Sequence, residues 1–232
     1  MKSIELTKST RDGNGQSIEQ TSRNATVTIT PPNIQTAIFR IEGTAPLVVH
    51  RFDKKVMQDF EDKIIQGSKP KGKNKFNPKD PEDICQAAKY IGETDGKQWE
   101  GFNASGIRLS MISACRGANF KMTIAKQSLF VEADGWDVLT PLIPLVRIIG
   151  KAQTSKMIAK AETGVAMLTI RPMYNPWSAK VRIRFDADLF SLSDVTNLLT
   201  RAGDCVGICE GRPDSKNSGG MGWGTFKIVN EK

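Results

Sequence analysis

The chain has 232 residues, of which 39% are hydrophobic and 25% are charged, a balance typical of a soluble globular protein. Its net charge of +8 favours an anionic partner, most often nucleic acid, and a basic protein without such a partner is the alternative. No apolar run approaches the roughly 20 residues of a membrane helix, so we expect no membrane partner. The N-terminus is polar and lacks a signal-peptide core, which predicts a cytoplasmic protein.

Basic residues gather in three parts of the chain where acidic residues are scarce. Cations in such stretches can neutralise the phosphates of a nucleic acid. For Arg182 and Arg184, which share one face of a strand pattern, a solvated face is the alternative. The predicted nucleic-acid-binding residues of these parts are Lys69, Lys71, Lys73, Lys75, Arg108, Arg116, Lys151, Lys156, Arg182 and Arg184.

Residues 1–33 are rich in Ser, Thr, Asn and Gly, which predicts a flexible N-terminal arm. Within this arm Ala25 to Thr30 alternates and could add a strand to a neighbour. We expect the remaining residues, 34–232, to form one α+β domain.

The domain begins with a half-buried strand, because apolar and polar residues alternate from Thr36 to Glu42. A short apolar run at 47–50 ends at His50, and a helix is expected from Asp53 to about Ile65. A lysine-rich loop and a helix at 82–91 follow, within an insertion that we place at 67–101.

The middle of the chain is predicted to be mostly strand. A helix that begins near Asn103 or Ser105 has Ile107, Met111 and Cys115 on its apolar side. Residues 151–164 are compatible with a helix or with the tip of a mobile hairpin. Strands are expected at 121–131, 142–149, 166–172 and 181–185.

The last part reads as helix, strand, glycine-rich loop and strand. Ser191 and Asp194 form a capping box at the helix start, and Gly203 is placed at its C-terminal cap. The apolar run from Cys205 to Cys209 predicts a buried strand, and Thr225 to Val229 predicts the closing strand. With the strand from Ala166, this order is compatible with a ferredoxin-like antiparallel sheet that carries helices on one face.

The loop from Gly211 to Gly224 contains five glycines together with Arg212, Lys216 and Trp223. Glycines let backbone N–H groups approach a phosphate closely, and an exposed tryptophan offers a stacking face for a base. Arg212, Lys216 and Trp223 are therefore predicted to bind nucleic acid. The alternative is a long hairpin loop whose tryptophan packs on the core.

The sequence indicates neither a metal site nor another cofactor. The four cysteines form no CxxC pair, and a single histidine cannot complete a zinc set with them. We expect four reduced thiols.

Three segments resemble the CRISPR-associated RAMP proteins, in particular the subunit that polymerises along guide RNA, and stand-alone phage proteins of the same layout. The segments are Gly43-Thr-Ala-Pro-Leu-Val-Val49, Ala104-Ser-Gly-Ile-Arg-Leu-Ser-Met-Ile-Ser-Ala-Cys-Arg116 and Gly-Gly-Met-Gly-Trp-Gly224. The resemblance implies an RRM-like core with thumb and finger elements at 67–101 and 151–164. It also implies that Arg108 and Arg116 lie on the helix facing the strand, and that copies stack head to tail.

The leading hypothesis is therefore a non-catalytic protein that binds single-stranded DNA or RNA without sequence preference and assembles along it as a filament or ring. It would act in phage or mobile-element DNA or RNA metabolism. Trp223 and, as further stacking faces, Phe76 or Trp177 would contact bases. By the same resemblance, His50 would be the base of a metal-independent endoribonuclease, against the alternative of a histidine bonded to backbone at a strand end. A basic virion or assembly protein is the third possibility.

Overall fold

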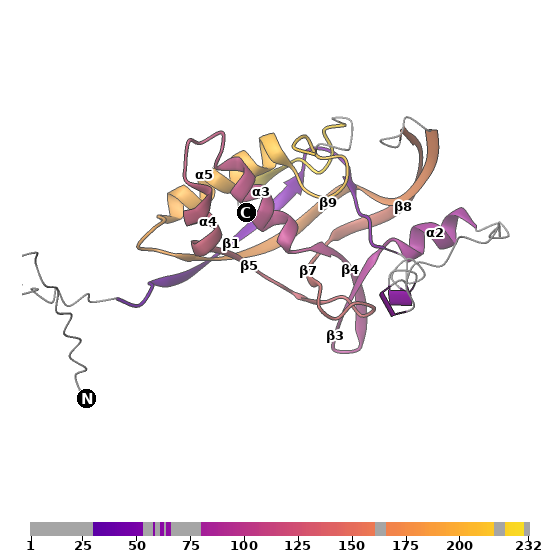
Figure 1. The fold of residues 1–232 in the computed structure, drawn as a ribbon, viewed down its shortest axis with the longest axis horizontal. Coiled ribbons are helices and arrows are strands. Elements are labelled where there is room, and N and C mark those ends of the chain that lie inside the picture. The colour runs from indigo at the N-terminus through magenta and orange to yellow at the C-terminus, as the bar shows by residue number, and fades with distance from the viewer. Residues whose placement is uncertain are drawn as a thin grey trace, which may run out of the picture. The chain divides into compact units, whose positions relative to one another are not determined.

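The computed structural model describes residues 30–52, 58, 61–62, 64–65, 80–160, 166–215 and 221–229 (Figure 1). Contacts divide the chain into two compact units, Met1–Pro31 and Pro32–Lys232, and the strands and helices named below belong to the second. Most of the predicted arm and the whole lysine-rich loop lie outside the described residues. Within the described ranges, no helix is long and apolar enough to cross a membrane.

Six strands of the described residues form the larger sheet, namely β1 (Ile34–Gly43), β2 (Leu47–Val48), β5 (Leu129–Glu132), β8 (Ile149–Lys160), β9 (Ala166–Asp186) and β10 (Phe226–Val229). The long strand β9 is its centre. The C-terminal half of β9 pairs with β1 and with β5, and its N-terminal half pairs with β8 and β2. β10 extends the sheet beyond β1, and all these pairings are antiparallel.

The helices α3 (Ser105–Ala114), α4 (Met122–Ser128) and α5 (Leu192–Arg201) pack on the half of this sheet that contains β1, β5 and β10. In the chain, α3 and α4 lie between β1 and β5, and α5 lies between β9 and β10. Figure 1 shows the three helices together on one side of β1 and β9. The order β10–β1–β9–β5 with these connections is compatible with a ferredoxin-like fold. The predicted α+β class with antiparallel pairing is confirmed.

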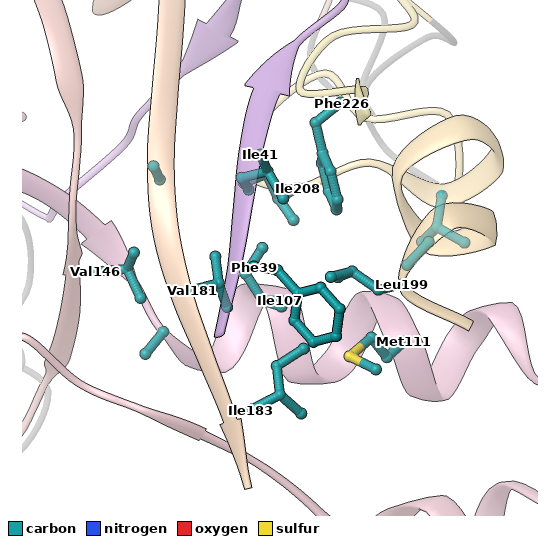
Figure 2. Close-up of a cluster of buried hydrophobic side chains, with 14 of the residues drawn as sticks. Phe39, Ile41, Ile107, Met111, Val146, Val181, Ile183, Leu199, Ile208 and Phe226 are labelled. Carbon is teal, nitrogen blue, oxygen red and sulfur yellow. The ribbon is translucent and has the colours of Figure 1, made fainter. Parts of the chain in front are cut away.

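The hydrophobic core lies between this sheet and the helices α3 and α5 (Figure 2). Phe39 of β1 and Val181 and Ile183 of β9 point toward Met111 of α3 and Leu199 of α5. All five side chains are buried. Complete burial of an aliphatic or aromatic side chain contributes about 1.5–3 kcal/mol. The alternation and the helical spacing in the sequence identify these core positions correctly.

A smaller antiparallel sheet of four described strands consists of β3 (Tyr90–Thr94), β4 (Lys97–Asn103), β7 (Pro144–Arg147) and β6 (Gly135–Trp136), in that order. Asp95 and Gly96 join β3 to β4 with φ angles of 52° and 71°, and positive φ at both positions is what a type I′ two-residue hairpin turn needs. The helix predicted at 82–91 is shorter, because α2 spans Pro81–Ala87 and the chain from Tyr90 pairs with β4.

The strand predicted at 121–131 is wrong for most of its length, because α4 occupies it and β5 begins only at Leu129. The guanidinium of Arg108 explains the difference. It donates hydrogen bonds to the carbonyl oxygens of Lys126 and Leu129, which lie at the end of α4. A helix leaves its last carbonyls without intrahelical partners, so this contact from α3 stabilises the helical form.

The strand predicted at Cys205–Cys209 is also wrong, because α5 continues into a π-helix at Ala202–Val206. Gly203 does not end the helix. A side chain there would place Cβ 2.1 Å from the carbonyl oxygen of Phe226, so glycine lets β10 pack against the helical turn. The helical segment ends instead at Gly207, which has a φ of 69°.

The helix considered for residues 151–164 is not formed, because β8 continues to Lys160 and pairs with β9 from Ala166. The hairpin alternative agrees with this pairing, although residues 161–165 lie outside the described ranges. The strands predicted at 166–172 and 181–185 are parts of the single strand β9.

Candidate functional site

A groove of about 560 Å³ lies between α3 and the chain that follows the π-helix. Gly106 and Ser113 of α3 line one wall, and residues from Val206 to Asp214 line the other. His50 and Tyr90 complete the lining from the segments around β2 and β3. The fold therefore assembles the groove from segments that are far apart in the sequence.

The start of α3 faces this groove with open backbone. Ala104 at the N-cap has no side chain that can cap the helix, and the Asn103 side chain accepts a hydrogen bond only from the Ser105 N–H, at 2.9 Å. No atom lies within 4 Å of the position that a Cβ of Gly106 would occupy. A helix start carries a partial positive charge and exposed N–H donors, which suit an anionic group such as phosphate.

The opposite wall is built from the first part of the glycine-rich loop. Cys209 and Gly211 have φ angles of 62° and 78°. The Trp223 ring lies so close to Gly211 that a Cβ there would be 2.4 Å from it, and the Trp223 N–H donates to the Gly211 carbonyl at 3.0 Å. Trp223 is half-buried, so one side of its ring covers the loop rather than open solvent.

A charged cluster stands at the His50 side of the groove. Glu210 accepts a hydrogen bond from Arg171 Nε at 3.0 Å, and His50 Nδ1 lies 3.6 Å from the same carboxylate oxygen. Burial lowers the pKa of His50 below its ordinary value of 6.5, with Arg171 adding to the shift and Glu210 opposing it. His50 is therefore an uncharged imidazole near pH 7, and its own carbonyl accepts a 3.4 Å hydrogen bond from the Tyr90 hydroxyl.

A second charged cluster joins the loop to the far end of α3. Both carboxylate oxygens of Asp214 lie 2.9 Å from Nη2 of Arg116, and Ser113 Oγ donates to the same carboxylate. Ser113 and Asp214 also line a neighbouring hollow of about 200 Å³, together with Arg116 and Arg201. The contact therefore separates two hollows that would otherwise adjoin.

The structure brings only part of the predicted set to the groove. Arg212 lines it and donates to the Cys209 carbonyl at 3.1 Å, and Arg116 stands at its end. Arg108 lies elsewhere, since its guanidinium is bonded to backbone beside α4 and lies 5.1 Å from the centre of the Phe130 ring. Arg108 therefore lies on α3 but not in the groove, and Arg116 follows the end of α3 at Ala114.

The other predicted residues lie on β8, on β9 or outside the described ranges. Lys151 and Lys156 are exposed on β8. Arg182 and Arg184 lie on β9, on the side of the sheet away from the helices. The predicted residues outside the described ranges are Lys69, Lys71, Lys73, Lys75 and Lys216, as is Phe76.

Trp177 does not offer the stacking face considered for it. Its side chain is 3% exposed, and its Nε1 donates to the Ala45 carbonyl at 2.8 Å. The ring also fills the space beside Gly43, where a Cβ would lie 2.0 Å from Nε1. Trp177 is a core residue.

Several residues of the groove carry no signal in the sequence. Tyr90, Arg171 and Glu210 reach it through long-range contacts between strand ends and the glycine-rich loop, and isolated residues of these types are common in any chain. Outside the groove, Lys180 could have been found from the sequence, because it continues the alternation of Arg182 and Arg184 by one further step along β9.

Comparison of the chain with protein-family models finds no match, and a search of curated proteins finds none either.

Proposed function

We propose that the protein binds single-stranded nucleic acid without sequence preference, with the strand in the groove between α3 and residues 206–214. The observation that carries the proposal is the composition of this groove. The start of α3 and the side chain of Arg212 offer donors to phosphate oxygens. Donors of this kind do not distinguish bases.

Aromatic rings at the His50 side of the groove support a single-stranded ligand. The Phe52 ring is 58% exposed and lies 5.3 Å from the His50 ring, and Tyr90 lines the groove nearby. Unpaired bases stack on such rings with little dependence on sequence. These rings replace Trp177 as candidate stacking faces, and Trp223 remains a further candidate.

The resemblance to RAMP proteins implies an antiparallel sheet with helices on one face. The order β10–β1–β9–β5, with α3, α4 and α5 on one face, is compatible with such a ferredoxin-like core. The hairpin of β8 and β9 would then be a protruding element.

The proposal includes assembly of copies along the strand. Ile158 of β8 and Leu168 of β9 are register partners in the hairpin, and their side chains are 77% and 61% exposed. An exposed apolar pair favours a contact with another protein surface. Repetition of one head-to-tail contact would produce a filament or an open ring.

The binding test is fluorescence anisotropy with labelled oligothymidine and oligouridine over a salt series. We expect affinity to fall steeply with salt, and Arg212→Ala to reduce the slope of log K against log salt by about 0.7, the value of one lost phosphate contact on a single strand. Lys126→Ala on α4 is the matched control and should leave the slope unchanged. Salt-insensitive self-assembly without strand binding would contradict the proposal and favour a virion or assembly protein.

A metal-independent endoribonuclease is the second candidate, because His50 is a neutral imidazole on the groove wall beside Glu210. A neutral histidine can accept the proton of a 2′-hydroxyl. Cys209 does not offer an alternative nucleophile, since burial raises the pKa of its thiol to about 12. Cleavage of oligouridine but not of oligothymidine, lost in His50→Ala, would establish the nuclease in place of the non-catalytic protein.

A further inference from the structure

The larger sheet has a second face that the helices leave open. Along β9 the buried residues Val181 and Ile183 point to the helices, so Lys180, Arg182 and Arg184 point to the opposite side. In Figure 1, α3, α4 and α5 all lie on one side of β1 and β9, so these three helices do not cover the other side of the two strands. The groove described above belongs to that helix side, because α3 forms one of its walls.

Cations dominate the open face of β1 and β9. In the register, Arg40 of β1 stands opposite Lys180, and Arg182 and Arg184 follow at successive positions of β9 that are about 7 Å apart. The result is a row of positive charges at regular spacing, which matches the repeated charge of a phosphate backbone.

The acidic residues near this face neutralise only part of the row. Arg182 pairs with Asp134 at 2.8 Å and with Glu132 at 3.7 Å, and Arg40 lies 3.7 Å from Glu42. Among the described residues, neither Lys180 nor Arg184 has a carboxylate within ion-pair distance. Both side chains are exposed. The open face therefore retains positive charge in its central part.

Apolar groups lie between these cations. Ile38 is the register partner of Arg182, and its side chain is 57% exposed. The Phe130 ring on β5 has the guanidinium of Arg184 5.2 Å from its centre and that of Arg108 5.1 Å from it, so its exposed edge is the part open to a ligand. Unpaired bases can pack against such groups while the cations contact phosphates.

We propose that the open face is a second nucleic-acid surface and that one molecule bridges two strands, one in the groove and one on the open face. This inference rests on the proposed function, since it assumes that the groove holds the first strand. A second copy of the chain is a poorer occupant, because a symmetric contact would place the row around Lys180 and Arg184 against an identical row.

The experiment measures the retention of a second strand. Biotinylated oligothymidine is immobilised, saturated with the full chain and washed, and fluorescent oligothymidine is then added. We expect the wild type to retain the fluorescent strand. Lys180→Glu with Arg184→Glu should bind the first strand within about threefold of wild type but lose at least about 90% of the retention. Lys121→Glu with Lys126→Glu reverses two exposed cations beside α4 and is the matched control.

The outcomes separate the two proposals. Failure of the wild type to bind the immobilised strand would overturn the proposed function and the bridging with it. Normal first-strand binding without retention, or equal retention in the open-face variant, would overturn bridging alone. Loss of retention in the control as well would make it an effect of overall charge, which also overturns the proposal. The proposal would also be overturned if light scattering without nucleic acid showed the open-face variant to be a smaller oligomer than the wild type. The open face would then be a contact between copies.

Discussion

His50 is the single histidine of the chain, so its titration can be followed by NMR as one set of imidazole resonances. We expect a midpoint below 6.5, because burial and Arg171 both disfavour the imidazolium. Glu210→Gln should lower the midpoint further, since the carboxylate raises the pKa of His50. A wild-type midpoint above 6.5 would show that Glu210 dominates and that His50 is charged at the groove under mildly acidic conditions.

Asp214 holds its carboxylate where a phosphate would contact Arg116. Asp214→Asn removes a negative charge from the groove and weakens the contact that holds Arg116 and Ser113. We therefore expect tighter binding of oligothymidine, by about 3- to 10-fold at low salt, measured by anisotropy.

Asp204→Asn makes the same charge change at an exposed position of the π-helix and is the control for this measurement. The expected change in the control is within about twofold. Weaker binding by Asp214→Asn would contradict the account, because Asp214 would then be needed to shape the groove rather than compete for Arg116.

At the scale of the elements, Gly203 of the π-helix is explained by close packing. Its backbone conformation does not itself require glycine. Gly203→Ala would force Cβ against the Phe226 carbonyl at 2.1 Å, and we expect it to lower the free energy of unfolding by about 1–3 kcal/mol. Gly106→Ala, at the start of α3, meets no atom within 4 Å and should be neutral or stabilising. Urea unfolding of both variants measures the difference, and equal stabilities would refute the packing argument.

The elements that could be predicted from the sequence are those whose signal is local. The capping box of Ser191 and Asp194 at the start of α5 is confirmed, with the Asp194 N–H bonded to Ser191 Oγ at 3.1 Å. The alternation at 36–42 correctly predicts β1. By contrast, α4 depends on hydrogen bonds from Arg108, 18 residues away from Lys126, and no local pattern contains that contact.

At the scale of the whole molecule, the sequence indicates the glycine-rich loop but not the groove beside it. Arg212 could be predicted because it lies among the glycines. Tyr90 and Arg171 could not, since Tyr90 lies in β3 and Arg171 in β9, and only the tertiary structure brings these strands to the groove. The open face was partly predictable from the alternation of Arg182 and Arg184.

Assembly of copies also belongs to this scale. Ile158→Glu places a charge on the exposed apolar pair of the β8–β9 hairpin, and we expect it to reduce the size of complexes on long single strands. Lys156→Glu, two residues earlier on the same strand, tests whether charge alone has this effect. Analytical ultracentrifugation with and without nucleic acid measures the size. Complexes of unchanged size in Ile158→Glu would exclude this hairpin from the contact.

The central claim is that a single strand lies in the groove between α3 and residues 206–214. Photo-crosslinking of bromodeoxyuridine-substituted single-stranded DNA, followed by mass spectrometry, tests it most directly. We predict adducts on the peptides that contain Phe52 and Tyr90, and their loss on competition with unlabelled oligothymidine. Competable adducts confined to peptides that do not line the groove would contradict the claim.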